Sequence, residues 1–174
     1  LQQLPSRPAP ARTARLPLPG GDIEDFQAFQ MRAQRAEPDI DPRALTALLR
    51  NHGAEYWRVL DAANGARTAL VPGTTTLCAE LRHTVEHEMA IHLEDVVMRR
   101  TDLAAGSHPG RAVLRNCAAL IGERLAWPAQ RIDAEVAATE GVLARHLASQ
   151  GGARGCTRNN ATAGSLLTAS PTEA

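Results

Sequence analysis

The stretch "TLCAELRHTVEHEMAIHLEDVVMRR", residues 76–100, is the longest segment of the chain with helical periodicity. Its apolar residues recur at spacings of three and four, which places them on one face of a helix. This stripe consists of Leu77, Leu81, Val85, Met89 and Val96. The pattern predicts one continuous helix over 76–100 that buries the stripe and carries ionisable residues on its other faces.

Shorter helical patterns lie on both sides of this segment. Asp22 and Asp41 are suitable N-cap residues, Pro42 suits the first turn of a helix, and Gly53 is a stop signal. The predicted helices span residues 22–36, 41–53, 54–63, 111–126 and 128–151. Because no run of β-branched residues alternates with polar ones, we predict an all-α fold, a bundle of five or six helices.

The two ends differ in composition from the 22–150 segment, which we predict to be one helical domain. Residues 1–21 are rich in Pro, Arg, Ala and Gly, which indicates a flexible linker to a preceding domain or an ordinary disordered leader. Residues 151–174 are mostly small or polar, which predicts a disordered tail.

Charge and cysteine content exclude several classes of function. The 19 cationic residues, all Arg, are balanced by 19 Asp and Glu, so nucleic acid and membrane surfaces are not expected partners. The 3 cysteines form no disulfide framework and no Cys-x-x-Cys motif, which favours a reducing cytosol. No apolar run reaches the ~20 residues that a membrane-spanning helix needs.

The histidines of the 76–100 segment suggest a metal site. His83 and His87 are four residues apart, and Glu80 precedes them by one turn, so the three could share one helix face. His92 lies about 140° around the helix from His87, and its spacing is one residue too long for the His-Glu-x-x-His zinc motif. A solvated polar face explains the row of Glu80, His83 and His87 equally well.

A second row of ionisable residues falls on the apolar stripe itself. Glu88, His92, Asp95 and Arg99 lie within about 60° of one another on an ideal helix. We call these four residues the polar ladder, and the expected pairs are Glu88 with His92 and Asp95 with Arg99. In one interpretation the ladder is buried and fixes the register of neighbouring helices or of a partner domain. In the other, Glu88 and His92 form an acid/base pair in a cleft.

The segment "AELRHTVEHEMAIHLEDVVMRRTDL", residues 79–103, resembles the carboxy-terminal domain of FAD-dependent, quinone-linked glycerol-3-phosphate dehydrogenases and the related glycerophosphate oxidases. The matching positions are Ala79-Glu80, Glu88-Met89-Ala90, Leu93-Glu94-Asp95-Val96 and Arg99-Arg100-Thr101. "RTARLPLPGG" resembles the join to the family's flavin domain, and "LAWPAQRIDAEVA" is similar to its final helix. The chain departs from the family at His83, where an aromatic residue is usual, and at His92, where a small hydroxyl is usual.

The resemblance implies a helical cap domain at residues 22–150, with residues 1–21 as a linker from a flavin domain. The family oxidises sn-glycerol 3-phosphate to dihydroxyacetone phosphate, with FAD as hydride acceptor and quinone or oxygen as the final acceptor. FAD binding needs a strand followed by a Gly-x-Gly-x-x-Gly loop and a helix, and neither "LPGGDI" nor "GGARG" has that form. No catalytic, cofactor-binding or metal-binding residue is therefore carried over to this chain.

We accordingly expect a chain that is inactive alone and whose partners are the flavin domain and, in an oligomer, further copies. The expected location is the cytoplasm, with the complete family enzyme peripheral at the inner face of the cytoplasmic membrane. Two other hypotheses stay open, a free-standing helical protein-interaction domain and a metal-binding helical protein.

Overall fold

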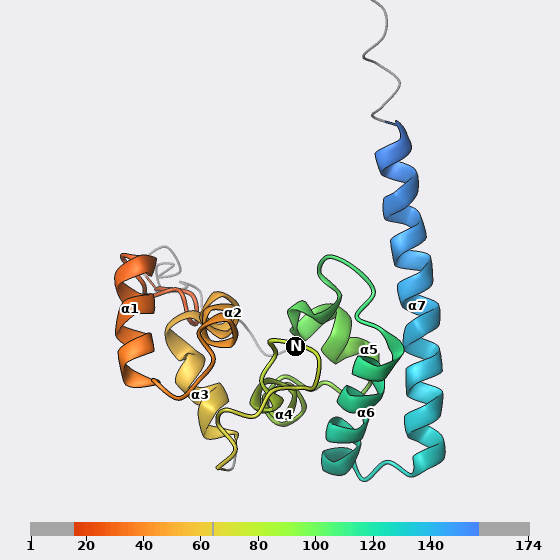
Figure 1. Cartoon of the computed structure of the whole chain (residues 1–174), viewed down its shortest axis with the longest axis horizontal. Helices are drawn as coiled ribbons and strands as arrows, with labels where there is room; N and C mark the ends of the chain where they lie inside the picture. The colour runs from red at the N-terminus through yellow and green to blue at the C-terminus, as the bar shows by residue number, and fades with distance from the viewer. Residues whose placement is uncertain (1–15, 64, 157–174) are drawn as a thin grey trace, which may run out of the picture.

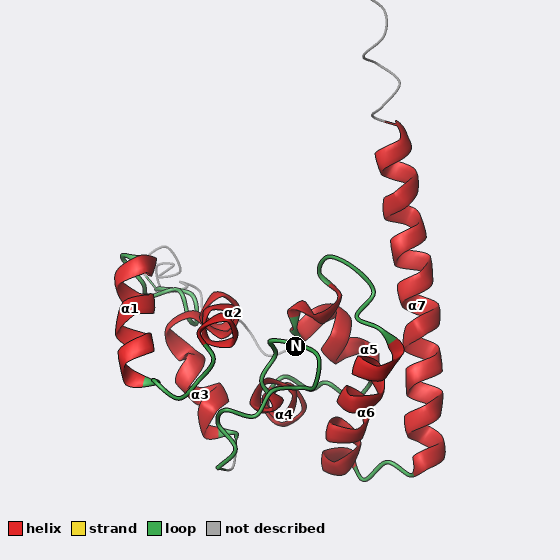
Figure 2. Ribbon diagram, in the orientation of Figure 1, coloured by secondary structure: helices red, strands yellow, loops and turns green. Residues whose placement is uncertain are grey.

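The computed structural model describes residues 16–63 and 65–156, with side chains placed up to residue 148 (Figure 1). Within these ranges the chain forms helices joined by turns and loops, and one isolated antiparallel bridge joins Leu70 to Leu77 (Figure 2). The predicted all-α class is confirmed. Most of the expected linker and residues 157–174 of the expected tail lie outside the described residues.

Helices of very different lengths follow one another along the chain. They are α1 (Phe26–Ala36), α2 (Pro42–His52), the 3-10 turn η2 (Gly53–Glu55), α3 (Tyr56–Asp61), α4 (Cys78–His87), α5 (Leu93–Asp95), the π-helical turn η3 (Val96–Arg100), the 3-10 turn η4 (Asp102–Ala104), α6 (Arg111–Leu125) and α7 (Ala129–Cys156). In Figure 1, α4 lies between the group α1–α3 and the group α5–α7.

Two hydrophobic cores meet at α4. The first core lies among α1, α2 and α3 and includes Leu45, Leu48, Leu49, Val59 and Leu60; the second lies among α4 to α7 and includes Leu93, Val96, Leu114, Ile121 and Leu143. Leu77 and Ala79 contact the first core, whereas Cys78 and Leu81 contact the second. Successive residues of a helix point about 100° apart, so one short helix serves both cores. The side chains of α4 that face neither core are thereby held at the junction of the two groups.

The predicted boundaries of α2 are confirmed. The Asp41 carboxylate accepts hydrogen bonds from the backbone N–H groups of Arg43 and Ala44, and Pro42 occupies the first turn. At the other end, the N–H of Ala54 donates to the carbonyl of Gly20 at 2.9 Å. Gly53 has φ +55°, and a Cβ there would lie 2.0 Å from that carbonyl oxygen. The segment before α1 thus crosses closely over the carboxyl end of α2.

The first helix begins later than predicted. Asp25, not Asp22, is the N-cap, because its carboxylate accepts from the N–H groups of Gln27 and Ala28. Residues before it are held in a turn instead, in which the N–H of Gly21 donates to the carbonyl of Leu18.

The prediction of one continuous helix over 76–100 is wrong. α4 ends at His87, and Met89 adopts a left-handed conformation with φ +55°. The N–H of Ala90 then donates to the carbonyl of Thr84 at 3.0 Å, and this hydrogen bond closes the end of the helix over seven residues. This position normally favours glycine, so the methionine gave no sequence signal for the end of the helix.

New hydrogen bonds at the start of α5 stabilise the break. The carboxylate of Asp95 accepts from the N–H groups of Ile91 and His92, and the carboxylate of Glu135 on α7 accepts from the N–H of Leu93 at 3.0 Å. These acceptors satisfy donors that a helix start leaves unpaired. The chain changes direction here because α7 supplies an acceptor from outside the segment.

The last two helices begin close to where the sequence predicts, but α7 continues to Cys156, beyond the predicted end at residue 151. Its carboxyl-terminal part extends past the other helices (Figure 1). Among the described helices, none combines the length and apolar character required to cross a membrane.

Candidate functional site

A pocket of about 630 Å³ opens where the carboxyl ends of α2 and α4 approach α3. Its wall is polar and mostly ionisable, and consists of Pro19, Asn51, His52, Glu55, Trp57, Arg58, Asp61, His83, His87 and Glu88. Both helices end here for the local reasons given above, namely Gly53 after α2 and the left-handed Met89 after α4. The pocket is therefore built at two helix ends, that of α2 in the group α1–α3 and that of α4 beside this group.

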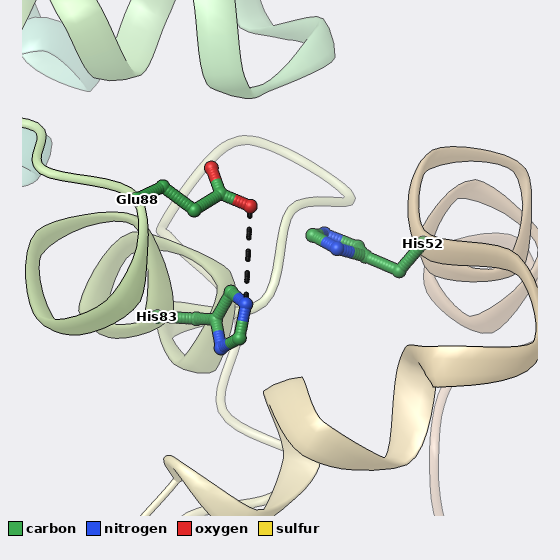
Figure 3. Close-up of side chains that lie close together, drawn as sticks. All are labelled: His52, His83 and Glu88. Atoms are coloured by element: carbon green, nitrogen blue, oxygen red, sulfur yellow. Dashed lines mark ion pairs between the residues drawn. The ribbon is translucent and has the colours of Figure 1, made fainter. Parts of the chain in front are cut away.

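Three potential metal ligands converge in this pocket. His52 comes from the last position of α2, His83 from α4, and Glu88 from the residue that caps α4 (Figure 3). One ligating atom from each of the three side chains lies within 4.8 Å of the other two. The Nε2 atom of His83 is 3.8 Å from Oε1 of Glu88, and the rings of His52 and His83 are nearly perpendicular with centroids 5.6 Å apart. We refer to these residues as the His52 cluster.

Burial favours the neutral form of both imidazoles of the cluster. It lowers the pKa of His52 and the pKa of His83 below the ordinary value of 6.5, and the nearby Glu88 carboxylate opposes this only partly. Within the described part of the chain, His52 Nε2 and His83 Nδ1 are buried without a hydrogen-bond partner. Each neutral imidazole has one ring nitrogen whose lone pair can bind a proton or a metal ion.

The predicted row of Glu80, His83 and His87 is assembled only in part: the ring centroids of His83 and His87 are 4.8 Å apart, but Glu80 does not join them. Glu80 does not lie on an outer face: it is only 1% exposed, and its carboxylate accepts from the N–H of Leu77 at 2.8 Å. His87 is exposed, with 59% of its side chain accessible, but His83 is largely covered, at 12%. Only His83 of the predicted row belongs to the cluster that the structure brings together.

Glu80 occupies an unusual environment at the junction of the two cores. Burial raises the pKa of its carboxyl to about 7, although hydrogen bonds from Leu77 and from the side chain of Asn51 lower it in part. Asn51 belongs to α2, so this contact joins α2 to the start of α4. Glu80 is thus a buried acid between the two groups of helices.

The polar ladder does not exist as one row, because the helix breaks at Met89. Glu88 and His92 are not paired: Glu88 approaches His83 and Arg100, whereas His92 Nδ1 lies 3.0 Å from Oε1 of Glu135. The predicted acid/base pair of Glu88 and His92 is therefore wrong as well.

The other expected pair of the ladder is confirmed, since Arg99 Nη1 donates to Asp95 at 2.6 Å. Burial of the ladder is wrong for His92 and Arg99, whose side chains are 54% and 57% exposed. His92, Asp95 and Arg99 instead line the surface around α5.

Sequence reasoning missed His52. It follows a polar residue and precedes a helix-ending glycine, and neither neighbour marks a ligand. Only the packing of α2 and α3 against α4 brings it to His83. A pattern search within one helix cannot detect such a long-range cluster.

The described residues form a small all-α domain with two cores, and this defines the class of protein. Among these residues there is no strand followed by a Gly-rich loop, the unit that binds the pyrophosphate of a dinucleotide or flavin. Residues 11–132 match the family described as the C-terminal domain of alpha-glycerophosphate oxidase, and the chain belongs to this family. The resemblance inferred from residues 79–103 is confirmed.

Several bacterial enzymes contain similar sequence. The chain is 33% identical over 138 residues to a glycerol-3-phosphate dehydrogenase of Mycobacterium leprae (strain TN), covering 77% of this chain and 24% of the relative. A glycerol-3-phosphate dehydrogenase of Pseudomonas aeruginosa is 30% identical over 106 residues, covering 60% of this chain and 21% of the relative. Glycerol-3-phosphate dehydrogenase 2 of Mycobacterium tuberculosis is 31% identical over 142 residues, covering 79% of this chain and 24% of the relative.

The chain therefore spans about a quarter of the length of the curated relatives it matches. No solved structure matches it significantly.

Proposed function

We propose that this chain is the helical accessory domain of an FAD-dependent glycerol-3-phosphate dehydrogenase and has no dehydrogenase activity alone. The observation that carries this proposal is its match to only 24% of the Mycobacterium leprae relative, within a family defined by a carboxy-terminal domain. In the complete enzyme, the flavin domain would bind FAD, oxidise sn-glycerol 3-phosphate to dihydroxyacetone phosphate and pass electrons to quinone.

We assign contact with the flavin domain to the surface around the turn between α4 and α5. Met89 is 85% exposed and Ile91 is also exposed, which is unfavourable for apolar side chains in water. The exposed polar side chains of His92 and Arg99 lie along the same part of the chain. An apolar centre with a polar rim is the usual anatomy of an interface between domains. We therefore keep the proposal that the polar ladder contacts a partner domain, and we add Met89 and Ile91 to this contact surface.

A chimaeric enzyme tests the accessory role. The carboxy-terminal segment of the Mycobacterium leprae enzyme is deleted, or replaced by this chain, and glycerol 3-phosphate oxidation is followed with a dye acceptor. We expect the deletion to lose activity and the chimaera to recover it. Recovery no better than the deletion would contradict the accessory role and favour a free-standing interaction domain.

Two matched variants of the chimaera test the contact surface. Met89→Asp should reduce the recovered activity, because a charge in an apolar interface is costly. Met31→Asp, the same change at an exposed position of α1, should have little effect. Equal effects of the two changes would contradict the assigned surface. The isolated chain, mixed with glycerol 3-phosphate, FAD and the dye, should show no turnover.

We also propose a cytoplasmic location, with membrane association supplied by the rest of the enzyme. Cys78 and Cys117 are free and buried, and burial raises the pKa of the Cys117 thiol to about 12. Reduced cysteines of this kind are typical of a reducing compartment. Assembly into a homo-oligomer is a further proposal, which light scattering of the complete enzyme would test.

A further inference from the structure

The His52 cluster has the composition of a transition-metal site. Two imidazoles and one carboxylate are ligand types that zinc and neighbouring divalent ions bind in proteins. Their ligating atoms lie within 4.8 Å of one another, although His52 comes from α2, whereas His83 and Glu88 come from α4 and its cap. Within the described chain, the buried Nε2 of His52 has no hydrogen-bond partner. An unpaired buried nitrogen costs stability, so its retention beside two other ligands needs an explanation.

We propose that His52, His83 and Glu88 bind a divalent transition-metal ion of the zinc class, which ties the carboxyl end of α2 to the carboxyl end of α4. This site goes beyond the accessory role proposed above and does not depend on it. It also differs from the row of Glu80, His83 and His87 that the sequence suggested, since His83 alone is common to both.

The distances are compatible with closure around an ion. Zinc binds nitrogen and oxygen ligands at roughly 2.0–2.2 Å, so ligand atoms of a tetrahedral site lie about 3.3 Å apart. From a separation within 4.8 Å, each pair of ligands needs to approach by about 1.5 Å or less. Small rotations of the three side chains can supply this movement. Three protein ligands leave the fourth position to a water molecule from the open pocket.

Neighbouring groups favour one orientation of the carboxylate. Oε2 of Glu88 lies 3.8 Å from Nε of Arg100, while Oε1 of the same residue faces His83. Arg100 therefore holds the carboxylate with its other oxygen toward the cluster, in the way that outer partners orient metal ligands. Besides Glu88, the pocket wall contains the acidic Glu55 and Asp61 and one cationic residue, Arg58. The lining thus has an excess of negative charge, which favours a cation.

Metal binding to the purified chain, stripped of metal with a chelator, is the direct test. We expect calorimetric titration with Zn²⁺ to show one site per chain, and Zn²⁺ to raise the melting temperature, because a ligand that binds only the folded state stabilises it. Co²⁺ should give the strong visible absorption of a tetrahedral site. Absence of a stoichiometric site with either ion would overturn the proposal.

Variants identify the ligands. His52→Ala and Glu88→Gln should each weaken Zn²⁺ binding by at least about tenfold, since loss of even an outer partner costs that much. His108→Ala, which removes an exposed histidine outside the pocket, should leave the affinity unchanged. Circular dichroism and melting without metal show whether each variant is folded, and His52→Gln replaces His52→Ala if the latter is not.

The pattern of losses distinguishes the two candidate ligand sets. Loss of binding in His87→Ala and Glu80→Gln, with normal binding in His52→Ala, would assign the ion to the single-helix row and refute the His52 cluster. Normal binding in all variants would show only adventitious association and would refute it too.

Discussion

Replacement of Glu80 by Gln should abolish a large part of the pH dependence of stability. The carboxyl of Glu80 is 1% exposed and accepts a hydrogen bond from the N–H of Leu77 at 2.8 Å. A glutamine has nearly the same shape, and its carbonyl oxygen can accept the same hydrogen bond. Glu80→Gln therefore removes the ionisation of this side chain while retaining its packing.

The magnitude follows from the shift in pKa. Burial raises the pKa of Glu80 from 4.5 to about 7 in the folded state. Between these values the unfolded chain has released the proton and the folded chain has kept it, so the free energy of unfolding falls as the pH rises. The stabilisation that protonated Glu80 contributes is fully present below pH 4.5 and is lost as the pH rises through about 7. A shift of this size corresponds to about 3 kcal/mol over the whole range.

Urea unfolding at about pH 5 and about pH 8 measures the effect. The unfolding free energy of Glu80→Gln, minus that of the unchanged chain, should be about 2–3 kcal/mol greater at the higher pH. His52 and His83 have lowered pKa values, so their protonation on unfolding acts in the opposite direction, destabilising the folded state as the pH falls below 6.5. Both histidines are present in both proteins, and their contribution cancels in the difference.

Glu123→Gln on the surface of α6 is the matched control, because Glu123 is exposed. The unfolding free energy of Glu123→Gln should differ from that of the unchanged chain by the same amount at both pH values. If Glu80→Gln behaves like this control, Glu80 is not a buried acid at the junction of the two cores, and the reasoning is refuted.

Two backbone predictions concern the ends of α2 and α4. Gly53→Ala should destabilise the chain by about 3 kcal/mol or more in urea unfolding, because the new Cβ would meet the Gly20 carbonyl at a positive φ. Gly106→Ala is its control, because a Cβ there meets nothing within 4 Å. An equally small loss of unfolding free energy in both variants would contradict the close approach of Gly53 to the Gly20 carbonyl. Met89→Gly should stabilise the chain by about 0.5–1 kcal/mol, since glycine relieves the left-handed conformation at φ +55°. The same change at Met31 inside α1 should destabilise by about 1 kcal/mol; a loss at both positions would refute the strain at Met89.

Much of the fold could be predicted because its signals are local. The start of α2 depends on Asp41 and Pro42, and its end on Gly53, all within one or two residues of the boundary. The apolar spacing of Leu45, Leu48 and Leu49 likewise identified a face that is fully buried. Capping and periodicity act over single turns, so the sequence alone determined the all-α class and most helix positions.

The family assignment also came from the sequence, through the residues around Glu88-Met89-Ala90 and Leu93-Glu94-Asp95-Val96. This same segment is where the prediction of secondary structure failed. Helical periodicity continues through Met89, and residues 76–100 contain neither Gly nor Pro. No local rule therefore predicts a break there. The break depends on Asp95 and on Glu135 of α7, which accept the hydrogen bonds of the restarted helix.

The tertiary structure alone decided which ionisable residues meet. An ideal helix placed Glu88 beside His92 and Glu80 beside His83, whereas packing buried Glu80 between two cores and turned His92 toward α7. His52 joined His83 and Glu88 only because α2 and α3 pack against α4. Spacing along the chain determines neighbours on one helix while that helix continues. Contacts between helices depend on where each helix ends and which core each face joins, and these are properties of the folded chain.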